Sequence, residues 1–336
     1  MTIAVVGCGA WGTVISQLIA KNTEAVTLFC HDETIVHEIN TNHTNTLYLP
    51  KEPILNPNIQ ARHLSELPAL IPEYNVIFIV VASSYYRDIL SHIKAVLSYD
   101  QIIVAATKGM EEQSLKSVYD ISIDVFSKEV CDNQFAILSG PNLAGEIYLG
   151  KPAATVIASK NAYLAEKVQK LISSDRFRAY VSDDVSGVSY GGILKNIIAI
   201  AAGILDAMEL GSNAKAALLV RGMAEIKRYA VHFGAKEETL MGLAGFGDLV
   251  TTCLGPDSRN YSTGYRIGKG EPLIDITSSM VSVAEGVKAC KVVYDIAKKE
   301  AIPMPITEGV YKVLYKNANV LEVTSLLMTR QLKKED

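Results

Sequence analysis

Ile3-Ala4-Val5-Val6-Gly7-Cys8-Gly9-Ala10-Trp11-Gly12 is the stretch that decides the fold: an apolar strand pattern runs directly into the spacing Gly-x-Gly-x-x-Gly. An apolar helical segment, Thr13–Ala20, follows it. Gly7 permits a tight turn, Gly9 lets the backbone approach a pyrophosphate, and Gly12 lets the helix pack closely on the strand. Because free N–H groups at a helix start attract phosphate, this arrangement predicts a dinucleotide cofactor. The alternative is a glycine-rich turn without a ligand, and the flanking strand and helix argue against it.

Short apolar runs alternate with helical patterns through the first half of the chain, which is typical of a doubly wound parallel sheet. The expected strands are Thr2–Val6, Ala25–Phe29, Val76–Val81, Gln101–Ala105 and Phe135–Leu138, with Ala154–Ala158 and Arg178–Val181 as an antiparallel extension. The expected helices include Glu33–Asn42, Tyr86–Leu97 and Leu115–Phe126. Pro50-Lys51-Glu52-Pro53 and Asn56-Pro57-Asn58 predict an irregular loop.

The second half of the chain is helical in pattern, because strand signals fade after Asp184. Long helical patterns cover Val185–Met208, Ala214–Phe233, Ala284–Glu300 and Ile306–Lys316. The acidic pair Asp183-Asp184 is suited to cap the first of these helices. The predicted fold class is therefore α/β, with a Rossmann-type dinucleotide-binding domain over residues 1–183 and an all-helical substrate and catalytic domain over residues 184–336.

Composition and charge exclude several classes of function. The chain has 336 residues, enough for two domains with real cores, and 49% of them are hydrophobic. A net charge of -4 argues against a nucleic-acid surface, although a cleft can still bind an anion through local fields. The five cysteines have no metal-binding or Cys-x-x-Cys spacing. Since no signal peptide and no apolar run of membrane-spanning length is evident, we expect a cytoplasmic protein with no metal and no membrane or nucleic-acid partner.

The end of the second predicted strand bears on cofactor preference. An acidic side chain there binds the ribose 2′-hydroxyl of NAD, whereas a basic one accommodates the 2′-phosphate of NADP. The segment reads Phe29-Cys30-His31-Asp32, and its acid suits the first role by its distance from the glycine-rich turn. His31 suits either group. The sequence therefore predicts NAD or NADP without deciding between them.

Three polar segments follow predicted strands, at the carboxyl ends where an open parallel sheet binds its ligand. They are Ser83-Ser84-Tyr85, Thr107-Lys108-Gly109 and Ser139-Gly140-Pro141-Asn142-Leu143-Ala144. Lys108, just before a glycine at such an end, is a natural clamp for an anion. The alternative for Lys108 is a solvated loop lysine.

Lys195 is unusual because it stands within the nearly all-apolar helical stretch Tyr190–Ile200. A charge there is costly unless it faces a cleft with partners. Desolvation would lower the pKa of this lysine toward the range in which proton transfer is efficient at neutral pH. The alternative, a lysine that extends along the helix to surface water, stays open on the residues alone.

Two further motifs in the helical half carry polar groups. Asp248 follows the glycine-rich segment Gly242–Gly247, and we expect it to hold Lys195 or a substrate hydroxyl, or else to cap a helix. Ser258-Arg259-Asn260 combines an arginine with small polar side chains, which suits a phosphate. A surface loop fits the composition of that segment equally well.

Together these motifs resemble the soluble, bacterial-type NAD(P)-dependent glycerol-3-phosphate dehydrogenase family, from Gly7 to about Gly309. The most specific matches are the glycine-rich start, Ala106-Thr107-Lys108-Gly109, Ser139-Gly140-Pro141, Gly191–Asn196, Ala244–Asp248 and Ser258-Arg259-Asn260. The chain departs from the family pattern at Ala82, Asn142 and Phe246, where proline, threonine and a smaller apolar residue are common.

The resemblance implies a role for each matching residue, with Lys195 as the catalytic proton acceptor and donor. The expected substrate-binding residues are Lys108, Gly140, Asn142, Lys195, Asp248, Thr252, Ser258, Arg259 and Asn260. The expected cofactor-binding residues are Gly7, Gly9, Ala10, Trp11, Gly12, His31, Tyr85, Lys108, Ala144, Arg259, Val283 and Glu285.

The resemblance also implies reversible hydride transfer between sn-glycerol 3-phosphate and dihydroxyacetone phosphate, which supplies glycerol 3-phosphate for phospholipid synthesis. NAD or NADP would be the cofactor, and no metal is needed. One alternative is another hydroxyacid-type dehydrogenase of the same two-domain plan, whose substrate carries a carboxylate. A second alternative is a sensor that binds NAD(P)H without catalysis. A helical second domain also offers a face for a homodimer.

Overall fold

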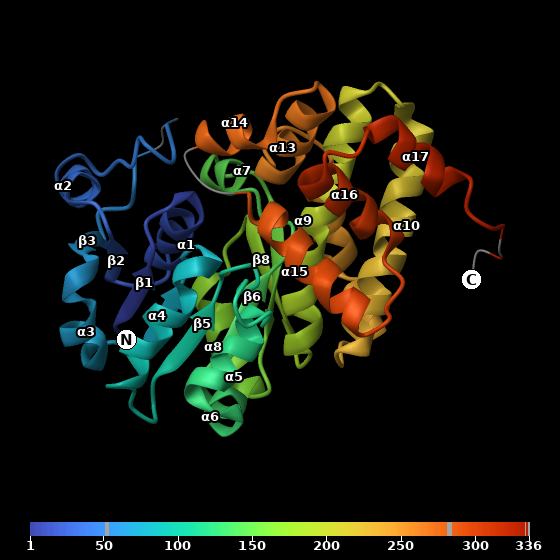
Figure 1. Cartoon of the computed structure of the whole chain (residues 1–336). Coiled ribbons are helices and arrows are strands. Elements are labelled where there is room, and N and C mark those ends of the chain that lie inside the picture. Colours follow the sequence, from blue (N-terminus) through green and yellow to red (C-terminus); the bar gives the residue numbers. More distant parts are fainter. Residues whose placement is uncertain (51–53, 281–283, 333, 335–336) are drawn as a thin grey trace.

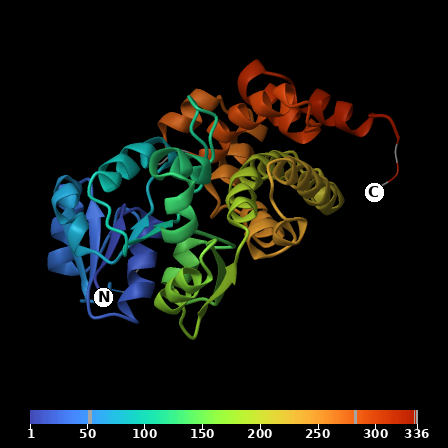
Figure 2. The same ribbon diagram turned by 90° about the horizontal axis from the view of Figure 1, so that it is seen from below.

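The computed structural model describes residues 1–50, 54–280, 284–332 and 334, which form a sheet domain followed by a helical domain (Figure 1). A long helix follows the last strand, and the described residues after it form helices and no further strand. A view turned by 90° shows the two domains side by side, with the N-terminus in the sheet domain and the C-terminus at the far end of the helical domain (Figure 2). The predicted fold class is confirmed.

The strands of the described residues form one sheet in the order β3-β2-β1-β4-β5-β6-β7-β8. Neighbouring strands are parallel except for β6 and β7. The strand order reverses between β1 and β4, and an open α/β sheet binds its ligand at such a switch point. The strands are β1 (Ile3–Val6), β2 (Val26–Cys30), β3 (Ile59–His63), β4 (Val76–Ile79), β5 (Ile102–Ala105), β6 (Phe135–Ser139), β7 (Ala153–Ala158) and β8 (Phe177–Ser182).

Helices cover both faces of the sheet, because successive strand residues point to opposite sides. In β1, Ile3 and Val5 belong to one apolar core, whereas Ala4 and Val6 belong to another. The helices of the sheet domain are α1 (Ala10–Ala20), α2 (Glu33–Asn42), α3 (Leu67–Leu70), α4 (Ser83–Lys94), α5 (Val118–Phe126), α6 (Lys128–Gln134), α7 (Ala144–Tyr148) and α8 (Ala162–Ile172), with 3₁₀ turns at Leu64–Glu66 and Ile71–Glu73.

The strands predicted from the sequence are confirmed, with ends that shift by at most two residues. In the extension, β7 is antiparallel to β6 as predicted, but β8 runs parallel to β7. The pattern of the sequence does not reveal β3, which follows the predicted irregular loop, and residues 51–53 of that loop lie outside the described residues. This edge strand buries only Ile59 and Ala61, so its apolar pattern is too short to stand out.

The long helix α9 (Val185–Ala207) lies at the centre of the helical domain. Asp184 caps it as predicted, since its carboxylate accepts a hydrogen bond from the N–H of Gly187 at 2.9 Å. By length and composition α9 could cross a membrane, but 89% of its apolar window is buried inside the protein, as in the core helix of a globular domain. The domain limits 1–183 and 184–336 stay a prediction.

The other helices of this domain pack around α9 or along its neighbours (Figure 1). They are α10 (Gly211–His232), α11 (Glu237–Leu240), α12 (Asp248–Cys253), α13 (Arg259–Gly268), α14 (Leu273–Ser278), α15 (Glu285–Lys299), α16 (Pro305–Lys316) and α17 (Val320–Met328), with a π-helical segment at Leu243–Gly247. The four long helices that the sequence predicts are confirmed as α9, α10, α15 and α16.

Glu225 of α10 is a buried carboxylate that caps the start of α16. It accepts hydrogen bonds from the backbone N–H groups of Ile306 and Thr307 and from the Thr307 hydroxyl. Burial raises the pKa of Glu225 to about 7, although these hydrogen bonds and the charge of Arg228 act in the opposite direction.

We therefore expect Glu225 to make the free energy of unfolding fall as the pH rises. Its pKa is near 4.5 in an unfolded chain, so between pH 4.5 and about 7 the folded protein binds more protons than the unfolded one. Relative to Glu225→Gln, the wild-type protein should lose on the order of 2–3 kcal/mol of stability across this window. Urea unfolding of both proteins at several pH values measures the difference, and identical pH profiles would contradict the expectation.

Candidate active site

The glycine-rich turn joins β1 to α1 at the switch point of the sheet. Gly7 has a φ of 112°, which side chains rarely adopt, and its N–H donates to the carbonyl oxygen of Phe29 at 3.0 Å. Gly9 is the N-cap of α1 and no side chain caps that helix, so its first N–H groups are open to an anion. A Cβ on Gly9 would meet no atom within 4 Å, which leaves space for a pyrophosphate close to the backbone. The turn therefore fits a dinucleotide.

Two alanine substitutions in this turn should have different effects. A Cβ on Gly12 would lie 1.8 Å from the carbonyl oxygen of Gly7, so Gly12→Ala should destabilise the fold by roughly 1–3 kcal/mol or more. Gly9→Ala should leave the melting temperature unchanged but weaken binding of reduced cofactor about tenfold, because its Cβ occupies the space for the pyrophosphate. Thermal unfolding and fluorescence titration measure the two effects, and an equal loss of melting temperature in both variants would contradict the assignment.

The residues after β2 have partners of their own. Asp32 caps α2, because its Oδ1 accepts hydrogen bonds from the N–H of Thr34 at 2.8 Å and from its hydroxyl at 2.6 Å. These hydrogen bonds hold the pKa of Asp32 below its usual value. His31 is exposed, and its carbonyl oxygen lies 3.2 Å from Nε2 of His63. The contacts of Asp32 and His31 therefore do not decide between NAD and NADP.

Lys195, Asp248, Lys108 and Thr252 form one hydrogen-bonded cluster between the domains. Nζ of Lys195 donates to Oδ1 of Asp248, and to the hydroxyl of Thr252 at 2.7 Å. Nζ of Lys108 donates to Oδ2 of Asp248 at 2.8 Å and to the carbonyl oxygen of Gly140 at 3.2 Å. The exposed fraction of the side chain is 20% for Lys108, 8% for Lys195 and 1% for Asp248. One carboxylate of the helical domain thus holds a lysine from each domain.

Burial has the largest effect on the charge of Lys195. Desolvation lowers the pKa of its amine from 10.5 to about 8, while the neighbouring Asp248 carboxylate raises it and Lys108 lowers it. An amine in this range can take up and release a proton near neutral pH. The alternative of a lysine that reaches surface water is wrong, and the predicted contact between Asp248 and Lys195 is confirmed.

A glycine in α9 lets Asp248 approach Lys195. A Cβ on Gly191 would lie 2.5 Å from the carbonyl oxygen of Ala244, so only glycine allows the π-helical segment to pack directly on α9. This packing places Asp248, the first residue of α12, opposite the lysine four positions further along α9. Gly191 therefore has a mechanical function in the site.

Asn260 uses both ends of its side-chain amide inside the protein. Its Nδ2 donates to Oδ1 of Asn196 at 2.9 Å, and its Oδ1 accepts from the N–H of Gly286 at 2.9 Å. Asn196 follows Lys195, and Gly286 follows Glu285. Asn260 therefore ties the start of α13 to α9 beside the cluster and to the start of α15.

Asn142 and Ser258 are also hydrogen-bonded within the protein. Asn142 donates to the carbonyl oxygen of Ala154 and accepts from the hydroxyl of Thr155, both at 2.9 Å. Ser258 is the N-cap of α13 and accepts from the N–H of Tyr261 at 3.2 Å. These contacts fix the orientation of both side chains, and their predicted contact with substrate stays a prediction.

The other predicted site residues come from several elements of both domains. Arg259 is exposed at the start of α13, and Tyr85 is exposed on the first turn of α4. Glu285, at the start of α15, accepts a hydrogen bond from Ser83 of the sheet domain at 2.7 Å. Val283 lies outside the described residues. Partly buried side chains beside the glycine-rich turn are Ala10, Trp11 and Ala144.

Asn196 and Ser83 belong to the candidate site although neither is among the site residues predicted from the sequence. Asn196 stands beside Lys195 in an apolar helix, and that isolated polar position was a usable signal. Ser83 lies in the segment Ser83-Ser84-Tyr85, but no pattern in the sequence separates it from Ser84. Among the described residues no group of three or more His, Cys, Asp or Glu side chains could hold a metal ion.

A glycine-rich turn that fits a dinucleotide and a buried lysine with a lowered pKa suit hydride transfer with a dinucleotide, so fold and site are those of a two-domain, nicotinamide-dependent dehydrogenase. Family models of the NAD-dependent glycerol-3-phosphate dehydrogenase N-terminus and C-terminus match residues 2–165 and 184–325. The chain belongs to this family, and the predicted resemblance is confirmed.

Similar proteins cover the whole chain. An NAD(P)+ glycerol-3-phosphate dehydrogenase of Citrifermentans bemidjiense is 41% identical over 336 residues, which span 99% of this chain and 98% of that protein. A protein of the same name from Syntrophotalea carbinolica is 39% identical over 335 residues, 100% of this chain and 99% of that one. The crystal structure of glycerol-3-phosphate dehydrogenase from Coxiella burnetii has a TM-score of 0.90 at 33% identity and covers 98% of this chain and 99% of its own.

Proposed function

We propose that this chain interconverts sn-glycerol 3-phosphate and dihydroxyacetone phosphate with NAD or NADP as cofactor. The observation that carries the proposal is the buried cluster of Lys195, Asp248 and Lys108 at the crevice of a chain from this family. The names of the similar proteins support the same reaction and a cofactor of the NAD(P) type.

Lys195 is the proposed acid and base of the reaction. When bound, the nicotinamide cofactor supplies the hydride for C2 of the ketone or accepts it from the alcohol. In reduction, protonated Lys195 donates a proton to the oxygen on C2, and in oxidation the neutral amine removes the proton of the C2 hydroxyl. Asp248 and Thr252 fix Nζ in position, so that little reorganisation is needed in either direction.

Arg259 and Lys108 are the proposed partners of the substrate phosphate and of the cofactor beside it. Arg259 extends from the first turn of α13, the helix that Asn260 ties to α9 beside Lys195. A guanidinium can bind a phosphate through two parallel hydrogen bonds. Binding energy at the phosphate would then orient C2 for hydride transfer.

Parallel assays with NADH and NADPH test the function. Dihydroxyacetone phosphate should cause the absorbance of at least one reduced cofactor to fall, whereas pyruvate, a ketone with a carboxylate and no phosphate, should not. Turnover of 2-keto acids alone would favour the hydroxyacid dehydrogenase. Tight binding of reduced cofactor without consumption by any phosphorylated ketone would favour the sensor.

We further propose that the protein acts in the cytoplasm and supplies glycerol 3-phosphate for phospholipid synthesis. The buried position of the one long apolar helix in the described residues supports a protein that is not inserted in a membrane. A cell that lacks this chain should then require added glycerol 3-phosphate for growth.

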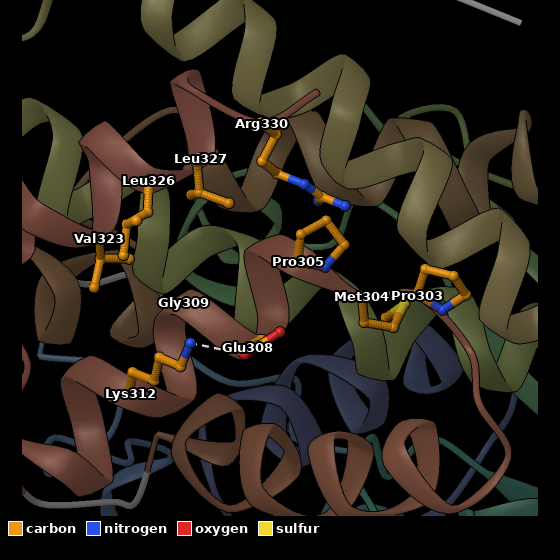
Figure 3. A pocket seen from close by; sticks show the side chains of 10 residues that line it. All are labelled: Pro303, Met304, Pro305, Glu308, Gly309, Lys312, Val323, Leu326, Leu327 and Arg330. Carbon is orange, nitrogen blue, oxygen red and sulfur yellow. Dashed lines mark ion pairs between the residues drawn. The ribbon is translucent and has the colours of Figure 1, made fainter. Parts of the chain in front are cut away.

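A homodimer through α17 is proposed as well. Six of the nine residues of α17 are apolar but none is buried, and Leu321, Leu326 and Met328 are 60%, 63% and 80% exposed. Beside them lies a groove of about 360 Å³, with a Glu308–Lys312 ion pair at its edge (Figure 3). The lining residues, none of which belongs to the candidate site, are Pro303, Met304, Pro305, Glu308, Gly309, Lys312, Val323, Leu326, Leu327 and Arg330.

A ridge of apolar side chains next to an apolar groove suits a second copy of this chain, because a two-fold axis would place each ridge in the partner's groove. Sedimentation should therefore report a dimer, and Leu326→Glu should shift it to a monomer. A monomer in the wild-type protein would contradict the proposal.

A further inference from the structure

Besides the Lys108–Asp248 ion pair, a hydrogen-bonded contact joins Ser83 of the sheet domain to Glu285 of the helical domain. Ser83 is the first residue of α4, and Glu285 is the first residue of α15. The Ser83 hydroxyl donates to Oε2 of Glu285 at 2.7 Å, and the Ser83 N–H lies 3.3 Å from Oε1 as its donor. Ser83 is only 3% exposed. Both donors of one residue therefore hold a single carboxylate of the other domain.

The contact lies on the reacting side of the crevice. A Cβ on Gly109 would lie 2.6 Å from Cβ of Ser83 and 3.0 Å from Oε2 of Glu285. The residue before Gly109 is Lys108, whose Nζ shares the Asp248 carboxylate with Lys195. The Ser83–Glu285 contact therefore packs against the residue that follows Lys108, a member of the cluster that would exchange a proton with substrate.

The position of Ser83 relative to the strands also indicates that the Ser83–Glu285 contact lies near the reacting end of a bound dinucleotide. Ser83 follows β4, the neighbour of β1 across the switch point, whereas the residues assigned to the adenosine end, such as His31, follow β2 on the other side of β1. A dinucleotide that crosses the crevice from the β2 side to the β4 side brings its nicotinamide end toward Ser83 and Glu285.

The chemistry of Glu285 fits one group of that ring. An ionised carboxylate only accepts hydrogen bonds and offers about four lone-pair sites, of which Ser83 uses two. In the part of the chain that the structure describes, Glu285 forms no ion pair, so neutral donors are its partners. The carboxamide N–H₂ is the one hydrogen-bond donor of a nicotinamide ring.

We propose that Ser83 is a positioning residue, which holds the Glu285 carboxylate so that it accepts a hydrogen bond from the carboxamide of the nicotinamide. The inference rests on the proposed function and adds a residue to it. A nicotinamide ring that is held through its carboxamide presents C4 in one orientation. Ser83 does not touch the ring, but by holding Glu285 it would affect the geometry of hydride transfer.

Binding measurements with two reduced cofactors test this without relying on turnover. The cofactors are NADH and its 3-acetylpyridine analogue, in which a methyl ketone replaces the carboxamide and removes the N–H donor. The variants are Ser83→Ala, Ser83→Thr, which keeps the hydroxyl, and the control Ser91→Ala, which removes an exposed hydroxyl from the same helix. NADPH and its analogue replace NADH if the wild-type protein binds them more tightly.

We expect Ser83→Ala to raise the Kd for NADH about tenfold and to leave the Kd for the analogue within twofold of wild type. Ser83→Thr should restore most of the affinity, and Ser91→Ala should change neither value. In turnover, Ser83→Ala should lower kcat/KM for NADH while the KM for dihydroxyacetone phosphate stays unchanged.

Three results would overturn the inference. An equal loss with both cofactors would show that Ser83 only supports the fold, and no loss with either would show that it does not position Glu285. Both results leave the proposed function intact if the wild-type protein oxidises NADH or NADPH with dihydroxyacetone phosphate. If the wild-type protein binds neither cofactor, the proposed function and this inference fail together.

Discussion

Lys195→Met is expected to lower kcat by roughly 10²–10⁴-fold in both directions, which is the usual contribution of a positioned acid or base. Methionine fills nearly the same space but has no amine. The substitution does not leave a buried charge without a partner, because Asp248 keeps its ion pair with Lys108. The fold should therefore survive, and binding of reduced cofactor should stay within a few-fold of wild type.

Lys215→Met provides the matched control for this variant. Lys215 of α10 is also partly buried and also pairs with a carboxylate, Asp206 at 2.6 Å, but it lies outside the cluster. Initial rates with dihydroxyacetone phosphate, fluorescence titration with cofactor and thermal unfolding separate turnover, binding and stability. Turnover of Lys195→Met within a few-fold of the control would rule out the proposed role of the amine.

The regular parts of the fold could be predicted because their burial pattern repeats. Strands such as β1 and β4 are buried on both faces and appear in the sequence as continuous apolar runs. The edge strand β3 and the short helix α14 lack such a pattern, since α14 buries only Ile276. Elements of this size are fixed by the larger elements on which they pack.

The site could be predicted only in part, for a similar reason. Lys195 could be predicted because a charge in an apolar helix requires a partner, and Asp248 because it follows a glycine-rich segment that fixes its backbone. The contacts of Asn260 and Ser83 join residues 64 and 202 positions apart, respectively. Such contacts depend on how α9, α13 and α15 meet the sheet, and no local pattern in the sequence encodes that approach.

Asp248→Asn should impair the enzyme through the charge state of Lys195. The Asp248 carboxylate raises the pKa of Lys195 against the effect of burial, so a neutral amide in its place should move that pKa below about 8. Lys195 and Lys108 would then share one uncharged partner in a buried position. Breaking a buried ion pair by removing one charge costs about 3–5 kcal/mol. We expect kcat/KM to fall by on the order of 10²-fold or more at neutral pH.

The pH dependence distinguishes this mechanism from a general loss of structure. Reduction of the ketone needs protonated Lys195, so kcat/KM in that direction should decline as the pH rises through about 8 in the wild-type protein. In Asp248→Asn the decline should begin at a lower pH, and the rise of the oxidative rate should begin at a lower pH as well. The matched control is Asp206→Asn. The Asp206 carboxylate also accepts hydrogen bonds from a lysine and a hydroxyl, those of Lys215 and Tyr261. If Asp248→Asn and Asp206→Asn both keep the wild-type pH profile, Asp248 does not control the proton of Lys195.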